Sequence, residues 1–233
     1  EVLDEQSIEV YKSVAHGQNI VEKGEDFKDR EIVLFAGQKL RAQEIGLLAA
    51  FGKEKVKVFK KPVIGIISTG DEVVSINSIP EAAQVRDINS YTLAGLVEAN
   101  GGIARQYGIV KDDLDELLKV CQKALSKSDM VVISGGSSVG MRDYTIEVLS
   151  ALPKSEILIH GISISPGKPT ILAKTVNKAF WGLPGHVTSA IVVFSTVVKP
   201  FLEHIAGFAL KYKTKSLISA RLTRNISSAQ GRV

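Results

Sequence analysis

Residues 62–207 alternate between short apolar runs and longer stretches with helical spacing, and this alternation constrains the fold more than any other feature. Residues 63–67 and 130–133 are apolar runs of strand length, whereas residues 112–126 place apolar side chains three and four positions apart. Strands that alternate with helices favour a largely parallel sheet with helices on both faces. We therefore expect an open, mostly parallel α/β domain. Its other expected elements are strands at 103–110, 157–164, 170–173 and 179–182, and helices at 89–99, 144–152 and 188–205.

The segments that flank this alternation have a different pattern. Residues 1–61 contain short apolar runs broken by glycines and one helix-like patch at 42–51, which predicts a small α+β or β-rich lobe. Pro62 marks its boundary, because a proline disfavours helix in the residue before it. Residues 217–226 alternate again, as at the start of a further β-rich part. Because the chain begins and ends in mid-pattern, we expect it to be an excerpt of a longer protein.

Composition narrows the function classes. With 45% hydrophobic residues the chain can bury a core, and a net charge of +4 is too mild to indicate nucleic acid binding. The single cysteine, Cys121, excludes a disulfide framework and a cysteine metal cage, which fits a reducing cytoplasm. The longest apolar stretch, residues 190–198, is far shorter than the ~20 residues of a membrane span. We therefore expect a cytoplasmic protein that binds neither nucleic acid nor a membrane.

Four loops of unusual composition follow predicted strands, and we number them in chain order. Loops at the carboxyl ends of parallel strands line the ligand crevice of an open α/β sheet. We therefore expect at least three of these loops to meet at one rim. The loops are Ser68-Thr69-Gly70-Asp71-Glu72, Ser134-Gly135-Gly136-Ser137-Ser138-Val139-Gly140, Ser165-Pro166-Gly167-Lys168-Pro169 and Gly182-Leu183-Pro184-Gly185-His186.

The composition of these loops suits a phosphate-bearing ligand. Glycines let the backbone approach a ligand and turn its N–H groups toward an anion, and hydroxyl groups add hydrogen bonds. Lys168 supplies a cation, to which His186 can add. Asp71, Glu72 and Asp143 would repel phosphate unless a cation intervened. Mg²⁺ prefers one or two carboxylates together with phosphate oxygens, so these acids predict a magnesium site.

Each of these features also has a simpler interpretation. A single glycine-rich loop is often only a turn, Asp71 and Asp143 could cap helices, and His186 could be a structural histidine. A rival motif is present as well, since residues 136–140 match the G-x-S-x-G nucleophile elbow of serine hydrolases. Against a hydrolase, no aspartate follows Asp143 to complete the Ser–Asp–His order, and residues 141–143 loosen a turn that should be tight.

Taken in order, these motifs resemble those of the molybdopterin molybdenumtransferases, the MoeA-type proteins that include the gephyrin E domain. The resemblance runs through almost the whole chain. Besides the four loops, it rests on Gly17-Gln18-Asn19-Ile20, Gly24-Glu25-Asp26, Glu44-Ile45-Gly46-Leu47-Leu48-Ala49, Arg86-Asp87-Ile88-Asn89, Val110-Lys111-Asp112-Asp113 and Asp143-Tyr144.

The resemblance implies an elongated, multi-domain homodimer. Residues 1–15 look like the tail of an inserted domain, and residues 16–61 look like part of the N-terminal linker domain. Residues 62–207 look like the molybdopterin-binding domain, and residues 208–233 look like the start of a C-terminal β domain. Members of the family take adenylylated molybdopterin and molybdate, and with Mg²⁺ they release AMP and place molybdenum on the dithiolene sulfurs of the substrate.

The resemblance also implies the site residues. The acids that match the family's active-site positions are Asp26, Glu72, Asp112 and Asp143, and the expected Mg²⁺ ligands are Glu72 and Asp143. Asp112 could equally be a helix-start acid, and Asp26 would reach the site only at a domain or subunit junction. The expected substrate-binding residues are Thr69, Gly70, Asp71, Ser134, Gly135, Gly136, Ser137, Ser138, Gly140, Pro166, Gly167, Lys168, Pro169, Pro184, Gly185 and His186.

Three departures from the family pattern concern the metalate. Gly161 and Ser165 stand where the family often has lysines, and losing two charged hydrogen bonds could weaken oxyanion binding by about 3–6 kcal/mol. His186 and Val187 replace a usual Asn-Pro, and Ser137 stands where valine is common. Tungstate, a nearly isosteric dianion, is therefore an alternative to molybdate.

Two alternatives to a transferase remain at this point. One is a non-catalytic molybdopterin-binding or scaffold protein on the same fold, as in the receptor-clustering role of the gephyrin E domain. The other is a related domain attached to another activity, such as a nucleotide amidase. The four acids favour catalysis over a scaffold, and Gly24-Glu25-Asp26 argues against the amidase.

Overall fold

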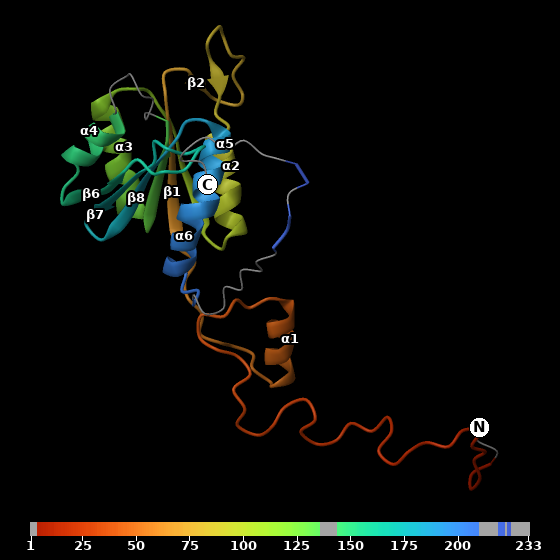
Figure 1. The fold of residues 1–233 in the computed structure, drawn as a ribbon. Coiled ribbons are helices and arrows are strands. Elements are labelled where there is room, and N and C mark those ends of the chain that lie inside the picture. Colours follow the sequence, from red (N-terminus) through yellow and green to blue (C-terminus); the bar gives the residue numbers. More distant parts are fainter. Residues whose placement is uncertain (1–3, 136–143, 210–218, 222, 225–233) are drawn as a thin grey trace.

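A six-stranded sheet forms the centre of the molecule (Figure 1). The computed structural model describes residues 4–135, 144–209, 219–221 and 223–224. The strand order is β4-β1-β5-β8-β7-β6, and the first four strands run parallel. β7 runs antiparallel to both of its neighbours. The strands are β1 (Val63–Thr69), β4 (Ile103–Val110), β5 (Met130–Ser134), β6 (Ser155–His160), β7 (Ile171–Thr175) and β8 (Lys178–Leu183).

Helices cover both faces of this sheet (Figure 1). α3 (Leu114–Lys127) and α4 (Tyr144–Ala151) pack on one face. α2 (Asn89–Ala99) packs on the other face, beside a continuous helical run. That run consists of α5 (Val187–Val193), the π-helical turn η1 (Phe194–Val198) and α6 (Lys199–Ile205).

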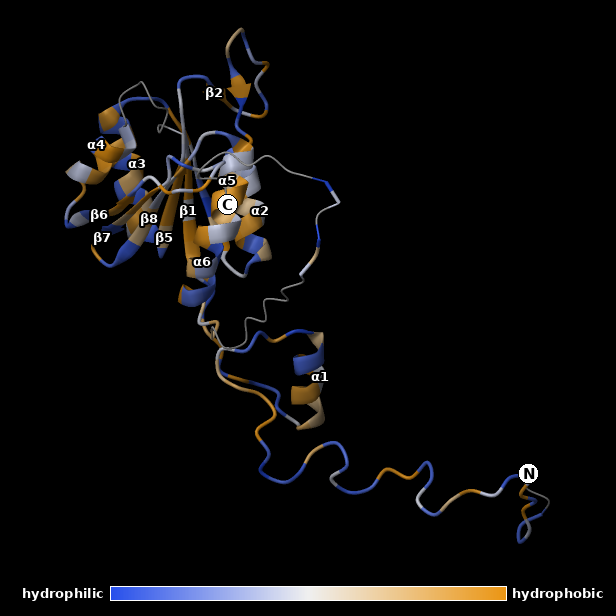
Figure 2. Cartoon of the chain, in the orientation of Figure 1, coloured by the Kyte–Doolittle hydropathy of each residue, from blue (hydrophilic) through white to orange (hydrophobic). Residues whose placement is uncertain are grey.

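Each face of the sheet has its own hydrophobic core. In β5, Val131 and Ile133 belong to the core under α3 and α4, whereas Met130 and Val132 belong to the core under α2 and the α5–α6 run. Side chains alternate between the faces of a strand, so a strand with helices on both sides is apolar at every position. This is why the central strands form continuous apolar runs, visible as orange ribbons in Figure 2.

The expected α/β class is confirmed, and two details differ from expectation. The predicted strand 157–164 ends at His160, because Gly161 adopts a positive φ of 87° that breaks the extended backbone. The sequence also gave no sign of a short parallel pair, β2 (Val73–Val74) with β3 (Val85–Arg86). Strands of two residues are too short for periodicity to reveal.

The segment before the sheet is not the α+β or β-rich lobe that we expected. Residues 4–61 contain one helix, α1 (Ala42–Ala50), and no strand. Many of their apolar side chains lack an opposing surface, since Ile20, Val21 and Ile32 are 65–78% exposed. A strand pattern needs such a partner to become a sheet. In Figure 1 the segment leads away from the domain at the end of the sheet opposite β2.

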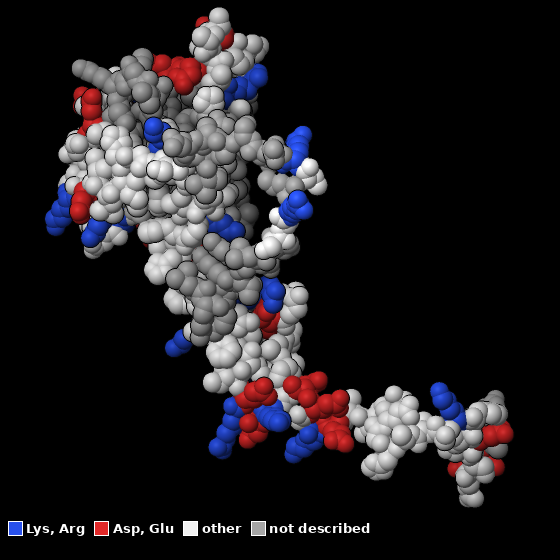
Figure 3. Space-filling model, viewed as in Figure 1, with Lys and Arg blue, Asp and Glu red and all other residues white. Residues whose placement is uncertain are grey.

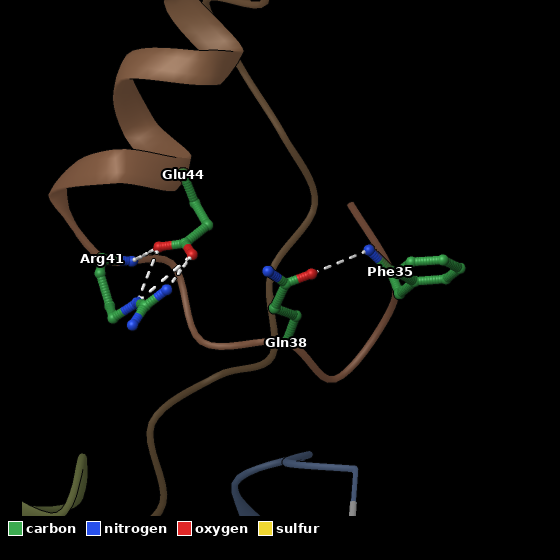
Figure 4. A network of polar contacts seen from close by, with 4 residues as sticks. All are labelled: Phe35, Gln38, Arg41 and Glu44. Carbon is green, nitrogen blue, oxygen red and sulfur yellow. Dashed lines mark hydrogen bonds and ion pairs between the residues drawn. The ribbon is translucent and has the colours of Figure 1, made fainter. Parts of the chain in front are cut away.

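Local polar contacts fix the start of α1 (Figure 4). The carboxylate of Glu44 accepts hydrogen bonds from the backbone N–H of Arg41 at 2.8 Å and from its guanidinium at 2.7 Å. The turn before the helix is closed by Gln38, whose side-chain oxygen accepts from the N–H of Phe35 at 3.3 Å. The bonds from Arg41 lower the pKa of Glu44 from its ordinary 4.5 to about 2.

The helical run Val187–Ile205 has 19 residues and is apolar enough, by length and composition, to cross a membrane. Its Val193, Phe194 and Val198 are fully buried in the core against the sheet. A core helix passes the same composition test, so the run carries no argument for a membrane. The expectation that the chain binds no membrane stays a prediction.

Candidate functional site

Three of the four loops begin side by side at the carboxyl ends of the parallel strands, which we call the carboxyl rim. The register pairs Ser68 with Ser134 and Ser134 with Leu183, so loops one, two and four leave the sheet at the same level. Loop three reaches the rim by another route. It lies between β6 and the antiparallel β7, and Ile171 at the start of β7 pairs with Gly182. The expected convergence therefore holds, although loop three does not directly follow a strand.

Two glycines let these loops approach one another closely. Gly135 has a φ of 104°, and a Cβ there would overlap the carbonyl oxygen of Thr69. Gly70 has a φ of 144°, and the carboxylate of Glu72 lies 2.7–2.9 Å from the position that its Cβ would take. A side chain at either glycine would push loops one and two apart or displace Glu72.

The amides of these glycines are used within the fold. The N–H of Gly70 donates to the carbonyl of Val110 at 3.3 Å, and the N–H of Gly135 donates to the carbonyl of Leu183 at 3.3 Å. The composition of the loops predicts that inward-turned glycine amides bind an anion. At these two positions the amides bind the chain itself, so any anion contact there would fall to other groups.

Three carboxylates instead make one part of the rim acidic (Figure 3). Asp112 accepts a hydrogen bond from the Thr69 hydroxyl at 3.0 Å, and its N–H donates to the carboxylate of Asp71 at 3.2 Å. Partial burial raises the pKa of Asp112 above its ordinary value, and the charges of Asp71 and Glu72 raise it further. The bond from Thr69 and the charge of Lys111 oppose this increase. Among the described residues, this part of the rim carries negative charge that Lys111 only partly balances.

The structure separates the roles of the two neighbouring aspartates. Asp113 caps α3, because its side chain accepts from the N–H of Glu116 at 2.8 Å. Asp112 lies just outside the helix and points its carboxylate to Thr69. Asp113, rather than Asp112, is therefore the N-cap of α3.

Lys111 is a rim residue whose role was not predicted from the sequence. Its ammonium donates to the carbonyl oxygens of Asp71 at 2.6 Å and Val73 at 3.2 Å. These bonds fasten loop one to the end of β4. A lysine in a loop has no pattern that predicts its partner, so only the fold reveals this contact.

A buried polar network lies beneath loops one and two. The Ser68 hydroxyl donates to Asp87 at 2.9 Å and lies 2.9 Å from the Ser90 hydroxyl and 3.4 Å from the Ser134 hydroxyl. Beside it, the side-chain amide of Asn89 donates to the carbonyl of Gly185 at 2.8 Å. Residues 86–89 are part of the family resemblance, but no role was predicted for Asp87 and Asn89. Polar residues at the start of an otherwise apolar helix were the available signal.

The remaining predicted residues have varied positions. Lys168 and His186 are exposed, Pro184 is buried, and Pro166 follows a cis peptide bond in loop three, whose Gly167 packs against Val193. Pro169 is half-buried, and Gly161 donates its N–H to the carbonyl of Thr170 at 2.8 Å. Asp26 is exposed in the segment before the sheet. The predicted residues Gly136, Ser137, Ser138, Gly140 and Asp143 lie outside the described residues.

No group of three His, Cys, Asp or Glu side chains in the described part of the chain is arranged to hold a metal ion by itself. Mg²⁺ does not require one, because it binds through one or two carboxylates, water and substrate phosphates. The donors on the acidic part of the rim are carboxylate oxygens, which suit this ion, and their partly unbalanced charge favours a cation. The described residues therefore fit Mg²⁺ as part of a site that the substrate completes.

Comparison with known proteins gives a consistent picture. A family described as "Probable molybdopterin binding domain" matches residues 65–204, and one described as "MoeA N-terminal region (domain I and II)" matches residues 1–52. The chain is 35% identical to a molybdopterin molybdenumtransferase of Haemophilus influenzae, over 93% of this chain and 53% of that protein. It is 34% identical to the enzyme of the same name from Staphylococcus aureus, over 88% of this chain and 50% of that protein.

A solved structure agrees with these matches. The molybdopterin biosynthesis MoeA protein from Pyrococcus horikoshii superposes with a TM-score of 0.72 at 37% identity, covering 80% of this chain and 46% of that one. The chain thus spans about half the length of the curated relatives that it matches.

Proposed function

Because this chain belongs to the MoeA-type molybdopterin molybdenumtransferase family, we propose that it acts in molybdenum cofactor biosynthesis as part of the enzyme that inserts the metal. The proposed reaction takes adenylylated molybdopterin and molybdate, releases AMP and leaves molybdenum on the dithiolene sulfurs. The observation that carries this proposal is the carboxyl rim, where glycine-lined loops meet beside the carboxylates of Asp71, Glu72 and Asp112.

The two parts of the rim would bind the phosphate groups of such a substrate in different ways. Near β1 and β4 the rim offers carboxylates, which would hold Mg²⁺ through Glu72, with Asp143 as the second proposed ligand. When bound there, Mg²⁺ would neutralise phosphate oxygens and favour departure of AMP. Near loops three and four the rim offers the exposed Lys168 and His186, which can pair with phosphate directly. An anionic substrate would therefore lie across the rim, with one end against Mg²⁺ and the other against Lys168 and His186.

The choice of metalate belongs to the same proposal. We propose molybdate as co-substrate, with tungstate as the alternative that fits the same charge and shape. Gly161 offers no side chain, and its amide is already bonded to Thr170, so it cannot replace a lysine as an oxyanion donor. Weak metalate binding is the expected consequence, and a titration of the protein with molybdate, tungstate and sulfate measures it.

The remaining proposals concern the whole protein. We propose a cytoplasmic homodimer in which Asp26 completes the site from another domain or from the partner subunit. The exposed position of Asp26 in this chain, in a segment that leads away from the rim, supports such a contribution rather than one within the chain.

A pair of neighbouring aspartates provides the test of function. In the full-length protein, Asp112→Asn should slow AMP release from adenylylated molybdopterin roughly 10–100-fold, because it removes a carboxylate that shapes the charge beside the metal ligands. Asp113→Asn is the matched control, since asparagine caps a helix as well as aspartate does. Its rate should equal that of the wild type. If the wild-type protein releases no AMP with molybdate and Mg²⁺, the proposed function is refuted. If both variants release AMP at the same rate, Asp112 has no role in the reaction.

A further inference from the structure

We infer that residues 87–90, at the start of α2, form a positioning clamp for the substrate-binding loops, with Asp87 and Asn89 as its positioning residues. This inference rests on the proposed function, because it concerns how the same rim is held in shape. Residues 87–90 contact the starts of loops one and two through Ser68, and they contact loop four through Gly185. One segment of four residues thus links three of the four loops.

Asp87 fixes the direction of every hydrogen bond in the network. Its carboxylate accepts from the Ser68 hydroxyl at 2.9 Å and from the Ser90 N–H at 3.0 Å. Ser68 has a single hydroxyl proton, which it donates in the hydrogen bond to Asp87. The hydroxyls of Ser90 and Ser134 must therefore both donate to the Ser68 oxygen. The Ser68 oxygen then has its full set of three bonds. The residue that begins loop two is thereby tied to the residue that begins loop one.

Asp87 also anchors the acidic part of the rim. Its backbone N–H donates to the carbonyl of Val74 at 2.9 Å, where the chain returns from residues 70–86. That stretch carries Asp71 and Glu72. Asp87 is 6% exposed, so these bonds form away from bulk water, where a carboxylate without partners would be strongly unfavourable. The backbone at residue 87 thus holds the stretch that carries the acids, and the Asp87 carboxylate holds the start of loop one through Ser68.

Asn89 holds loop four at a cost in stability. Its side-chain N–H donates to the carbonyl of Gly185, while its side-chain oxygen is buried and has no hydrogen-bond partner among the residues that the structure describes. A buried acceptor without a partner destabilises a fold, and an apolar side chain of the same shape would avoid that penalty. The amide of Asn89 is thus explained by the placement of Gly185 rather than by stability.

The contact between loops two and four shows what this placement controls. The N–H of Gly135 donates to the carbonyl of Leu183 at 3.3 Å, and a Cβ at Gly185 would lie 3.6 Å from the Cα of Gly135, so the two loops lie close together. Asp87 sets the position of loop two through Ser68 and Ser134, and Asn89 sets that of loop four. Together they define the spacing of the backbone on which a substrate would rest.

The first test measures amide hydrogen exchange in the full-length protein without substrate. Asp87→Ala should accelerate exchange in residues 68–72 and 134–135, whereas Asn89→Leu should accelerate it only in residues 183–190. Asn100→Leu is the matched control, because Asn100 lies at the other end of α2 and donates its side-chain N–H to the carbonyl of Leu96 at 2.7 Å. It should leave all of these segments unchanged. Equal exchange in wild type and both clamp variants would overturn the inference.

The second test separates positioning from a purely structural role. Asn89→Leu should keep or raise the Tm, while the KM for adenylylated molybdopterin rises roughly 10-fold and kcat changes less than about twofold. Asp87→Ala should raise KM as well, and Asp87→Asn should recover most of the loss, because asparagine keeps an acceptor for Ser68. If Asn89→Leu lowers the Tm and leaves KM unchanged, Asn89 is structural and the inference fails.

The two tests also keep this inference apart from the proposed function. If the wild-type protein releases no AMP, the function is refuted, and hydrogen exchange alone then decides whether the clamp exists. If Asn89→Leu does not fold, Asn89→Ala provides the same comparison with a smaller side chain. Altered exchange in the predicted segments supports the clamp, and unaltered exchange refutes it.

Discussion

The α/β domain and the segment before it contain the same kinds of apolar residue but use them differently. In the domain, Ile64, Ile66 and Phe180 are fully buried beneath helices. In the segment, Ile8 is 70% exposed and Val21 is 78% exposed. Figure 2 shows the contrast, since the orange strands of the domain lie between helices, whereas the orange parts of the segment lie on an extended trace. Apolar periodicity becomes structure only where an opposing surface completes the core.

This difference extends to the candidate site. The domain brings Thr69, Asp71 and Asp112 into contact without help from other parts of the chain. The segment carries Asp26, which lies exposed and far along the chain from the rim. A completed core can position a site, whereas a segment with an exposed apolar surface can contribute to one only after it meets its own partner.

The largest expected effect is on the core. Phe180→Ala should lower the free energy of unfolding of the domain by about 3–5 kcal/mol, because it removes a fully buried ring and leaves a cavity. Ile20→Ala in the segment should change it by less than about 0.5 kcal/mol, since Ile20 is 65% exposed. Denaturant unfolding followed by the fluorescence of Trp181 measures both. A large effect of Ile20→Ala would mean that the segment is part of the same cooperative unit.

A smaller effect is expected at the glycines. Gly135→Ala should destabilise the domain by roughly 2–3 kcal/mol, because it places a side chain at positive φ and against the Thr69 carbonyl. Gly17 also has a positive φ, of 79°, but nothing lies within 4 Å of a Cβ there. Gly17→Ala should therefore leave domain unfolding unchanged. The same denaturant curves compare the two, and similar shifts would show that backbone strain alone, rather than the contact between loops, determines the cost.

The sequence predicted the domain better than its details. α2 and β4 have the expected bounds because their apolar spacing is long and regular. The prediction of an α+β or β-rich lobe was wrong, because the apolar pattern in residues 4–61 does not reveal whether another surface covers these side chains. At the rim, the loops could be predicted from their place after the strands. The contacts of Lys111, Asp87 and Asn89 could not, since they join residues 19 to 96 positions apart, and no local pattern encodes such pairs.

The smallest expected effects are on pH dependence, where one acid from each region should respond in opposite directions. The hydrogen bonds from Arg41 hold the pKa of Glu44 at about 2, below its ordinary 4.5. The stabilisation of α1 by Glu44 is therefore present above pH 4.5 and is lost as the pH falls toward 2. Burial and the nearby acids raise the pKa of Asp112 above its ordinary 3.8. Its contribution is favourable below that value and is lost as the pH rises through the raised pKa.

Two conservative variants isolate these contributions. Asp112→Asn should make the domain slightly more stable at pH 7 and reduce the gain in stability that the wild type shows on acidification toward pH 4. Glu44→Gln should instead remove the acid sensitivity of α1 below pH 4.5, because glutamine keeps a neutral acceptor for the N–H of Arg41. Unfolding curves report on the domain, and amide exchange in residues 45–53 reports on α1. If Asp112→Asn instead destabilises the domain at pH 7, a cation bound to the isolated protein compensates the Asp112 carboxylate. Removing divalent metal with a chelator should then make the variant more stable than the wild type, as predicted.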